Sequence, residues 1–401
     1  MDDCKRSKSK IMSRQKRLRL RRNPNLVVGW RPELESEMAT AEEINNDSVP
    51  SLPMDLVGEI FCRLPVKLLL QLRCMCKSWN CLISDRNFTR KHLSLSTSHR
   101  LHYAVYKSEP HELIHNSYPL DSVSVLSTNL TQQHLLLYNS ITASCDGILC
   151  LQIKSKGLVA LWNPSIRKFK ELPPFETPQI LNKVYPTFGF GYDHVSHHYK
   201  VIVLYYTAFS KLNSVDTTKV KVHTLGANCW KTIETFPFGA VLDEQAGTHV
   251  RGTIHWIAYT QWCRKGPLFI LSFDLGNDSC QKLLPPHHAD ISPDYLTLSV
   301  LRDSLCLISD HHIWVMKEYG IHDSWTKLCS VTYIQDPSMR LSKALYVFDD
   351  DRLLLETHEE TSPDEEWKRN LVVYDPKNDT FKVTMFKNFL YVCLESLISC
   401  S

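Results

Sequence analysis

The sequence lacks any long apolar run. No stretch of roughly 18 apolar residues occurs, and the N-terminus has no short apolar segment of the kind that opens a secretory signal. We therefore expect a soluble intracellular protein that is cytoplasmic, nuclear or both. In that reducing setting the 14 scattered cysteines should stay thiols and act as small core hydrophobes, as at Cys150, Cys306 and Cys393.

The sequence also lacks two motifs that mark common enzyme classes. Neither GxxxxGK[ST] nor GxSxG occurs, so a phosphate-binding loop and a nucleophile elbow are unsupported. Phe188-Gly189-Phe190-Gly191 resembles the start of a nucleotide-binding loop, but the third glycine is absent, and we expect a tight turn between strands there. Three His-His pairs, at 197–198, 287–288 and 311–312, stand in polar segments without a cysteine or carboxylate at ligand spacing. We expect no catalytic residue, no metal site and no cofactor.

The whole chain has no large excess of positive or negative charge, but one segment does. The net charge is +3, yet residues 1–24 carry ten Lys and Arg against Asp2 and Asp3, which makes this segment +8 and leaves −5 for the rest. Such a segment can be a disordered leader, a nuclear-import signal, or a contact for nucleic acid or anionic lipid. We expect residues 1–50 to be a disordered leader. Nucleic-acid binding rests on this leader alone and is not favoured, and no membrane partner is expected.

A helical module is predicted at residues 51–84. Apolar residues repeat at helical spacing between Pro53 and Pro65 and predict a first helix, which Pro65 ends. A second helix is predicted at 66–75, where four leucines exceed what one neighbour can cover, and a third ends near Asp85. Three helices in about 40 residues are at the lower size limit for folding alone, so part of this apolar surface should need a partner. A plain helical subdomain that caps the next domain is the alternative.

The order of residues in this module resembles an F-box, in particular that of plant proteins. The matching residues are Leu52-Pro53, Leu56, Ile60, Leu64-Pro65-Val66, Leu69, Arg73, Cys76-Lys77, Trp79 and Leu82-Ile83. The resemblance implies that residues 51–92 dock onto the Skp-type adaptor of a cullin-based ubiquitin ligase. The residues that it implies face the adaptor are Leu52, Pro53, Leu56, Ile60, Leu64, Pro65 and Leu69. It also implies that Trp79 and Ile83 hold the helices together.

The remaining three hundred residues contain a repeat. Strand-like apolar runs recur at steps of 53, 53, 51 and 48 residues, marked by Ile148, Val201, Ile254, Leu305 and Leu353. A period near 50 with several short strands per unit is typical of kelch-like β-propeller blades. Segments within 101–143 can supply strands of a sixth unit, closed by residues 389–392. An irregular β-sandwich or an incomplete ring is the alternative, and the number of blades stays open.

Each unit carries a second signature, in which a strand turns and returns through an aromatic residue or a cysteine. The gap is seven residues in four units, from Trp162 to Phe169, His223 to Trp230, Phe273 to Cys280 and Tyr374 to Phe381. In the remaining unit the gap from Met316 to Trp325 is nine, which predicts a longer turn at 318–320.

The same segments resemble, in order, the F-box-associated domain that follows the F-box in large plant families. They include 144–147 (SCDG), 161–165 (LWNPS), 188–193 (FGFGYD), 252–256 (GTIHW) and 374–376 (YDP). The resemblance extends over residues 101–398. We therefore predict an α+β multidomain protein, with a three-helix F-box followed by an all-β kelch-like propeller.

The two resemblances imply a substrate-recognition subunit of a Skp-cullin-F-box ubiquitin ligase, which recruits a target protein for ubiquitination and degradation. The helices would hold the adaptor, and through it cullin, while propeller loops present the target. Catalysis would then be proximity, with no acid, base or nucleophile from this chain. The alternative is a binding module that sequesters or localises its partner without ubiquitin transfer. The target stays unknown, because loops on a propeller diverge freely.

Overall fold

The computed structural model describes residues 52–107, 112–120, 131–136, 140–153, 158–175, 184–208, 215–233, 241–243, 245–260, 266–287, 291, 295–332, 339–359, 368–386 and 390–400. The chain divides into two units, Met1–Pro53 and Met54–Ser401. The predicted leader at 1–50 lies outside the described residues. Within the described ranges, none of the helices combines the length and the apolar character needed to span a membrane.

Four helices begin the second unit, where three were predicted. They are α2 (Met54–Phe61), α3 (Val66–Leu72), α4 (Lys77–Ser84) and α5 (Arg86–Leu95). α2 ends before Pro65, which stands instead at the N-cap of α3 with extended backbone. The additional helix α5 begins because the Asp85 side chain accepts a hydrogen bond from the Phe88 backbone N–H at 2.9 Å, which caps its first turn.

Six antiparallel sheets make up the rest of the described chain. The first sheet contains β4 (Ser140–Cys145), β5 (Ile148–Ile153), β6 (Leu158–Asn163) and β7 (Lys168–Glu171), and the second contains β8 (Val184–Asp193), β9 (His198–Ala208), β10 (Val215–Thr224) and β11 (Lys231–Ile233). The third contains β12 (Val241–Leu242) and β13 (Thr248–Val250), which both pair with β14 (Thr253–Tyr259), followed by β15 (Leu268–Asp274) and β16 (Ser279–Leu283). The fourth contains β17 (Leu296–Leu301), β18 (Ser304–Ser309), β19 (His312–Met316) and β20 (Trp325–Ser330). The last two are β21 (Met339–Val347), β22 (Leu353–Glu359), β23 (Lys368–Asp375) and β24 (Thr380–Phe386); and β25 (Leu390–Leu394), β1 (His99–Lys107), β2 (Glu112–Pro119) and β3 (Thr131–Leu136).

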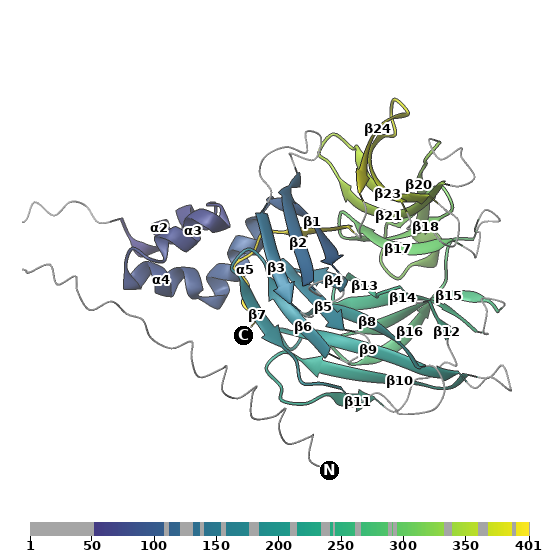
Figure 1. Cartoon of the computed structure of the whole chain (residues 1–401), viewed down its shortest axis with the longest axis horizontal. Coiled ribbons are helices and arrows are strands. Elements are labelled where there is room, and N and C mark those ends of the chain that lie inside the picture. The colour runs from purple at the N-terminus through teal and green to yellow at the C-terminus, as the bar shows by residue number, and fades with distance from the viewer. Residues whose placement is uncertain are drawn as a thin grey trace, which may run out of the picture. The chain divides into compact units, whose positions relative to one another are not determined.

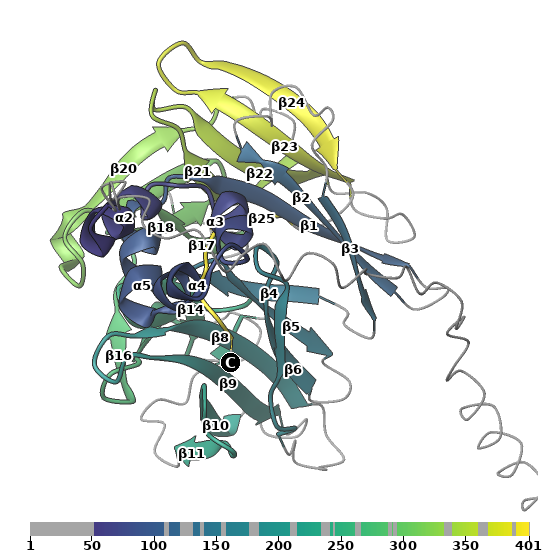
Figure 2. The same ribbon diagram turned by 90° about the vertical axis from the view of Figure 1, so that its left-hand side faces the viewer.

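The sheets close into a ring, which confirms the propeller and sets its blade number at six. Strand β4 contacts β8, β8 contacts β13, β13 contacts β17, β17 contacts β21, β21 contacts β25, and β25 returns to β4 (Figures 1 and 2). The last sheet joins both ends of the propeller, since β25 pairs with β1 and brings Val392 opposite Leu101. The predicted closure of the sixth unit by the C-terminal segment is therefore confirmed.

The sequence period corresponds to positions in the core. All five marker residues, Ile148, Val201, Ile254, Leu305 and Leu353, are buried where neighbouring sheets pack together. The predicted core cysteines Cys150, Cys306 and Cys393 are also buried, and burial raises the pKa of each thiol to about 12. The prediction is wrong for other cysteines, because Cys74, Cys76, Cys81 and Cys229 are exposed.

The interval of seven residues corresponds to pairs of residues that face each other across a hairpin. Trp162 pairs with Phe169, Phe273 with Cys280, and Tyr374 with Phe381 across neighbouring strands. The nine-residue gap also ends in a direct pair, between Met316 and Trp325. Its two additional residues form a longer turn that contains the 3₁₀ helix η4 (His322–Ser324), as the sequence predicts.

The tight turn predicted at Phe188-Gly189-Phe190-Gly191 is wrong, because all four residues lie within strand β8. The two phenylalanines point into the core between the first two sheets. The glycines allow close packing on the other face, since a Cβ at Gly189 would lie 2.7 Å from Trp256 and one at Gly191 would overlap His249. Glycine inside this strand therefore marks the close approach of a neighbouring sheet.

Candidate adaptor interface

The helical module has a small core of its own. Phe61 and Trp79 pack edge to face with ring centroids 5.2 Å apart, and Ile83 and Leu69 are fully buried beside them. Trp79 and Ile83 therefore hold the helices together, as the resemblance implied. The propeller contributes Leu397 to the same cluster.

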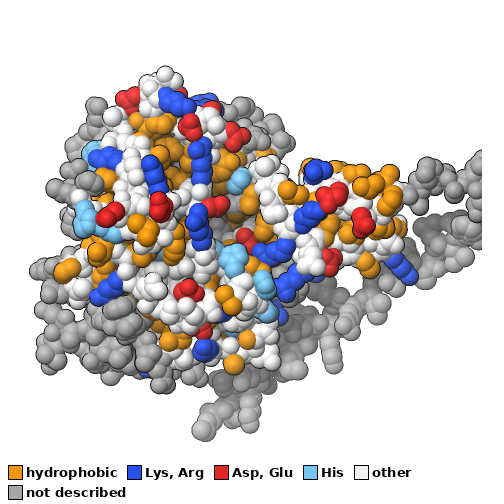
Figure 3. Space-filling view, turned by 180° about the vertical axis from the view of Figure 1, so that it is seen from behind, with side chains coloured by type: hydrophobic (Ala, Val, Ile, Leu, Met, Phe, Trp, Pro, Cys, Tyr) orange, Lys and Arg blue, Asp and Glu red, His pale blue; other side chains and the backbone are white. Residues whose placement is uncertain are grey.

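Helix α2 divides its apolar residues between two faces. Val57 and Phe61 turn toward the core, whereas Leu56 and Ile60, one turn apart, are 53% and 50% exposed. The exposed large apolar residues of α2, α3 and the turn after α3 are what we call the apolar helix surface: Met54, Leu56, Ile60, Leu68 and Met75. Figure 3 shows hydrophobic side chains gathered on this module. Covering such exposed apolar side chains with another protein lowers the free energy of the complex, so this surface favours binding.

The residues expected to face an adaptor differ in their accessibility. Leu56, Ile60 and Pro65 are exposed, as are Leu52 and Pro53 in the first unit. Leu64 is half-buried. Leu69 has no exposed area, so in this chain it belongs to the helical core instead of an open surface. The adaptor contact stays a prediction for all seven residues.

Helix α5 is joined to the propeller by a partly buried polar network that the sequence patterns did not indicate. Arg90 donates to Asp146 Oδ2 at 2.7 Å and to Tyr199 Oη at 2.9 Å, and its guanidinium lies 3.6 Å from the centroid of the Tyr192 ring. Tyr199 donates to the same Asp146 oxygen at 2.8 Å. We call these four side chains the Arg90 junction. The ion pair is only about one quarter exposed, so water screens it weakly.

Local backbone explains how Asp146 reaches α5. Asp146 and Gly147 both have positive φ, 52° and 79°, and form the two-residue turn between β4 and β5. The Asp-Gly pair suits this turn, because aspartate tolerates the left-handed region and glycine adopts it freely. The turn carries the Asp146 side chain to the edge of the sheet. The SCDG segment was the available sequence signal, but its partner lies 56 residues away.

Two further contacts hold the helices. Lys91 on α5 donates to Glu59 on α2, and this contact lowers the pKa of the glutamate. His92 contacts the Leu64 carbonyl oxygen through Nε2 at 2.9 Å. Together with the Arg90 junction, they make α5 the bridge between the apolar helix surface and the propeller.

A cysteine and histidine lie together next to the Arg90 junction, but they do not form an activated nucleophile. Cys145 Sγ is 3.6 Å from His249 Nδ1. Burial raises the pKa of the Cys145 thiol well above its usual range and lowers the pKa of His249 to about 4. Both groups are therefore neutral near pH 7, the opposite of the thiolate and imidazolium that cysteine catalysis requires.

The sequence contains one metal-protease motif beyond those considered above. Residues 111–115 read HELIH, which fits HExxH, a spacing that brings both histidines to one metal on a helix. His111 lies outside the described residues. Glu112 to His115 lie in strand β2 and not on a helix. His115 is buried against His102, with His115 Nε2 2.9 Å from His102 Nδ1. The described part of the motif therefore lacks the helix on which this spacing places its residues around a metal.

Comparison with known proteins agrees with this architecture. Residues 49–91 match the F-box domain model, and residues 102–398 match the model of the F-box associated beta propeller domain. The F-box/kelch-repeat protein At3g23880 of Arabidopsis thaliana is 29% identical over 306 residues, which cover 71% of this chain and 81% of that protein. The putative F-box protein At3g16210 of the same plant is 27% identical over 378 residues, covering 86% and 97%. F-box protein CPR1, also from Arabidopsis thaliana, is 29% identical over 310 residues, covering 70% and 73%.

The match to the propeller domain model alone spans well over half of the chain. The six antiparallel sheets form a β-propeller, the fold that this family model describes. This chain belongs to the family of proteins with an F-box domain and an F-box associated beta propeller domain.

Proposed function

We propose that this chain is the substrate-recognition subunit of a Skp-cullin-F-box ubiquitin ligase. The observation that carries the proposal is the apolar helix surface on a module that matches the F-box domain. An Skp-type adaptor would cover this surface and connect the chain to cullin. The propeller would hold a target protein, which would then be ubiquitinated and degraded. This assembly would act in the cytoplasm, the nucleus or both.

In this proposal the chain supplies position and no reacting group. A target lysine held near the ubiquitin thioester of a conjugating enzyme gains effective concentration, which can replace direct chemical participation. The Arg90 junction supports such a role, since it ties the helical module to the propeller through four side chains. A firm connection keeps the bound target within a narrow range of positions.

The first test is adaptor binding by surface variants. Covering the half-exposed Leu56 or Ile60 completely is worth roughly 1 kcal/mol each, about half the value for full burial. An aspartate there would also place a charge in a desolvated contact, which costs several kcal/mol. Leu56→Asp and Ile60→Asp should therefore weaken binding by about 100-fold or more.

Leu328→Asp is the matched control, because Leu328 is a leucine of similar exposure, 50%, on propeller strand β20. It should bind the adaptor as the unchanged chain does. Circular dichroism confirms that each variant is folded. Equal adaptor binding by all three variants would remove the proposed interface.

The second test separates degradation from sequestration. Target proteins captured with a Leu56→Asp variant, which retains the propeller, are followed in cells that express the unchanged chain. Under the proposal, proteasome inhibition raises the amount of a captured target. If the amount of a captured target changes neither with expression of the chain nor with proteasome inhibition, the protein only sequesters or localises its partner.

A further inference from the structure

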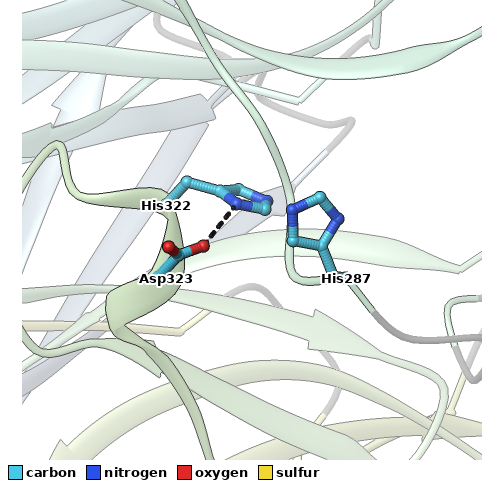
Figure 4. A group of neighbouring side chains, drawn as sticks. All are labelled: His287, His322 and Asp323. Atoms are coloured by element: carbon cyan, nitrogen blue, oxygen red, sulfur yellow. Dashed lines mark hydrogen bonds and ion pairs between the residues drawn. The ribbon is translucent and has the colours of Figure 1, made fainter.

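Two loops from neighbouring sheets bring three possible metal ligands together. His287 follows β16 of the third sheet, while His322 and Asp323 lie in η4 of the fourth (Figure 4). One ligand atom of each residue lies within 4.8 Å of the other two. No carboxylate stands at ligand spacing from the pair at 287–288 in the sequence, and the carboxylate near His287, Asp323, comes from the next blade.

The hydrogen bonds of His322 determine which of its nitrogens is free. His322 Nε2 lies 2.9 Å from the Pro285 carbonyl oxygen, which can only accept, so Nε2 carries a proton. In the neutral ring, Nδ1 then has a lone pair, and it faces Asp323 Oδ1 at 3.3 Å. A lone pair and a carboxylate oxygen repel each other, and a metal ion between them would make both atoms its ligands.

The arrangement around His322 resembles that of a metal ligand. Histidines that bind metals usually donate their other ring N–H to a backbone carbonyl or a carboxylate, which fixes the ring and the tautomer. The bond to Pro285 does this for His322. His287 adds a second imidazole, with ring centroids 3.6 Å apart and planes at 83°. His287 would supply the third ligand of an ion held between His322 and Asp323.

Two equivalent contacts between neighbouring blades show how the segment that carries His287 differs from its counterpart. Trp230 donates its ring N–H to the Pro173 carbonyl at 2.7 Å, and Trp325 donates equivalently to Leu284 at 3.1 Å. At the first junction Phe175 packs on Trp230, with centroids 5.4 Å apart. At the second junction, the chain beyond Leu284 instead presents His287 at the surface, opposite the longer turn between β19 and β20.

We propose that His287, His322 through Nδ1, and Asp323 bind a divalent transition-metal ion of the zinc class. Two imidazoles and one carboxylate are ligands that zinc accepts, and three protein ligands leave a fourth position for water or for a donor of a bound partner. His287 and Asp323 are exposed, so an ion reaches the site directly. The site does not involve the apolar helix surface and is independent of adaptor binding.

The test is zinc titration of the untagged, chelator-treated full chain by calorimetry, with cobalt absorption as a second readout. We expect one equivalent of zinc, and cobalt bands typical of tetrahedral nitrogen and oxygen ligands. His287→Ala, His322→Ala and Asp323→Asn should each lower zinc affinity by roughly tenfold or more.

His311→Ala is the matched control, because His311 contacts Asp310 at 2.9 Å but belongs to no group of three ligands among the described residues. It should keep the affinity of the unchanged chain. Zinc should also raise the thermal midpoint of the unchanged chain and of this control, but not that of the three site variants. Absence of zinc binding at millimolar concentration, or equal binding by the three site variants, would overturn the proposal.

Discussion

Replacing Arg90 by alanine should loosen the helical module from the propeller without affecting the apolar helix surface. The change removes the ion pair with Asp146, the bond to Tyr199 and the stacking on Tyr192. A hydrogen bond to a charged group is worth about 1.5–3 kcal/mol, and the quarter exposure of both side chains reduces this by screening. With stacking included, we expect a loss of about 2 kcal/mol in the free energy of unfolding.

The assay is urea unfolding of the full chain, followed by far-ultraviolet circular dichroism, with a double-mutant cycle to isolate the pair. Asp146→Asn suits the cycle because asparagine tolerates the positive φ of 52° at this position. The coupling energy between the two changes should be about 1 kcal/mol. Arg302→Ala is the control, since Arg302 and Asp351 form a pair in which both side chains are about half exposed, and its loss should cost less than about 1 kcal/mol.

Additivity of the Arg90 and Asp146 changes within about 0.5 kcal/mol would contradict the coupling between these residues, and so would an Arg90→Ala cost no larger than that of Arg302→Ala. Adaptor binding gives a second check. Because Arg90 contacts the propeller and lies outside the apolar helix surface, Arg90→Ala should leave the adaptor affinity within about twofold of the unchanged chain. A large loss of affinity would show that the junction shapes the adaptor contact.

Three other predictions concern stability. Leu69→Ala should destabilise the helical module by about 2–5 kcal/mol, because it empties a fully buried site; urea unfolding measures this, and a neutral result would contradict the burial. Gly191→Ala should cost about 1–3 kcal/mol, since its Cβ would overlap the His249 ring, and a thermal midpoint equal to that of the unchanged chain would show that the strands separate easily. Burial lowers the pKa of His115 to about 3 and of His255 to about 4, so below about pH 6.5 the unfolded chain binds protons that the folded chain does not. Stability should therefore fall on acidification from pH 7 to 5, by about 2 kcal/mol per histidine, and His255→Asn should make that fall shallower; an unchanged slope would contradict the assignment.

The repeat was predictable from sequence because hairpin geometry fixes local distances. A hairpin pairs residues at regular separations across its turn, so an interval of seven that recurs with turn residues in between, as from Trp162 to Phe169, is consistent with a repeated hairpin. The longer interval from Met316 to Trp325 likewise indicates the longer turn. The ring closure was predictable only as one possibility, a sixth unit closed by the C-terminal segment, and the pairing of β25 with β1 shows that the ring closes in this way.

Other local features were not predictable because two signals competed. Helix α5 has a polar sequence. It buries Phe88, Thr89 and His92, of which only Phe88 is a large apolar residue, so its apolar period is weak. The two glycines of β8 suggested a turn, whereas they allow a close approach to Trp256 and His249. Glycine alone does not distinguish these two uses.

The site was predictable only in part, because helical spacing does not separate inside from outside on a short apolar helix. Helix α3 is apolar around most of its circumference, so the sequence did not show that Leu69 faces the core while Leu68 stays exposed. The Arg90 junction and the group of His287, His322 and Asp323 depend on contacts between residues far apart in sequence. Such contacts follow from the order of blades in the ring and have no local pattern.

The most direct test of the account is light scattering with size-exclusion chromatography on the full chain mixed with a purified Skp-type adaptor. We expect a one-to-one complex with the unchanged chain, and separate elution of the two proteins with the Leu56→Asp variant. A chain that elutes alone in both mixtures, although folded, would contradict the claim that its helices form an adaptor-binding surface.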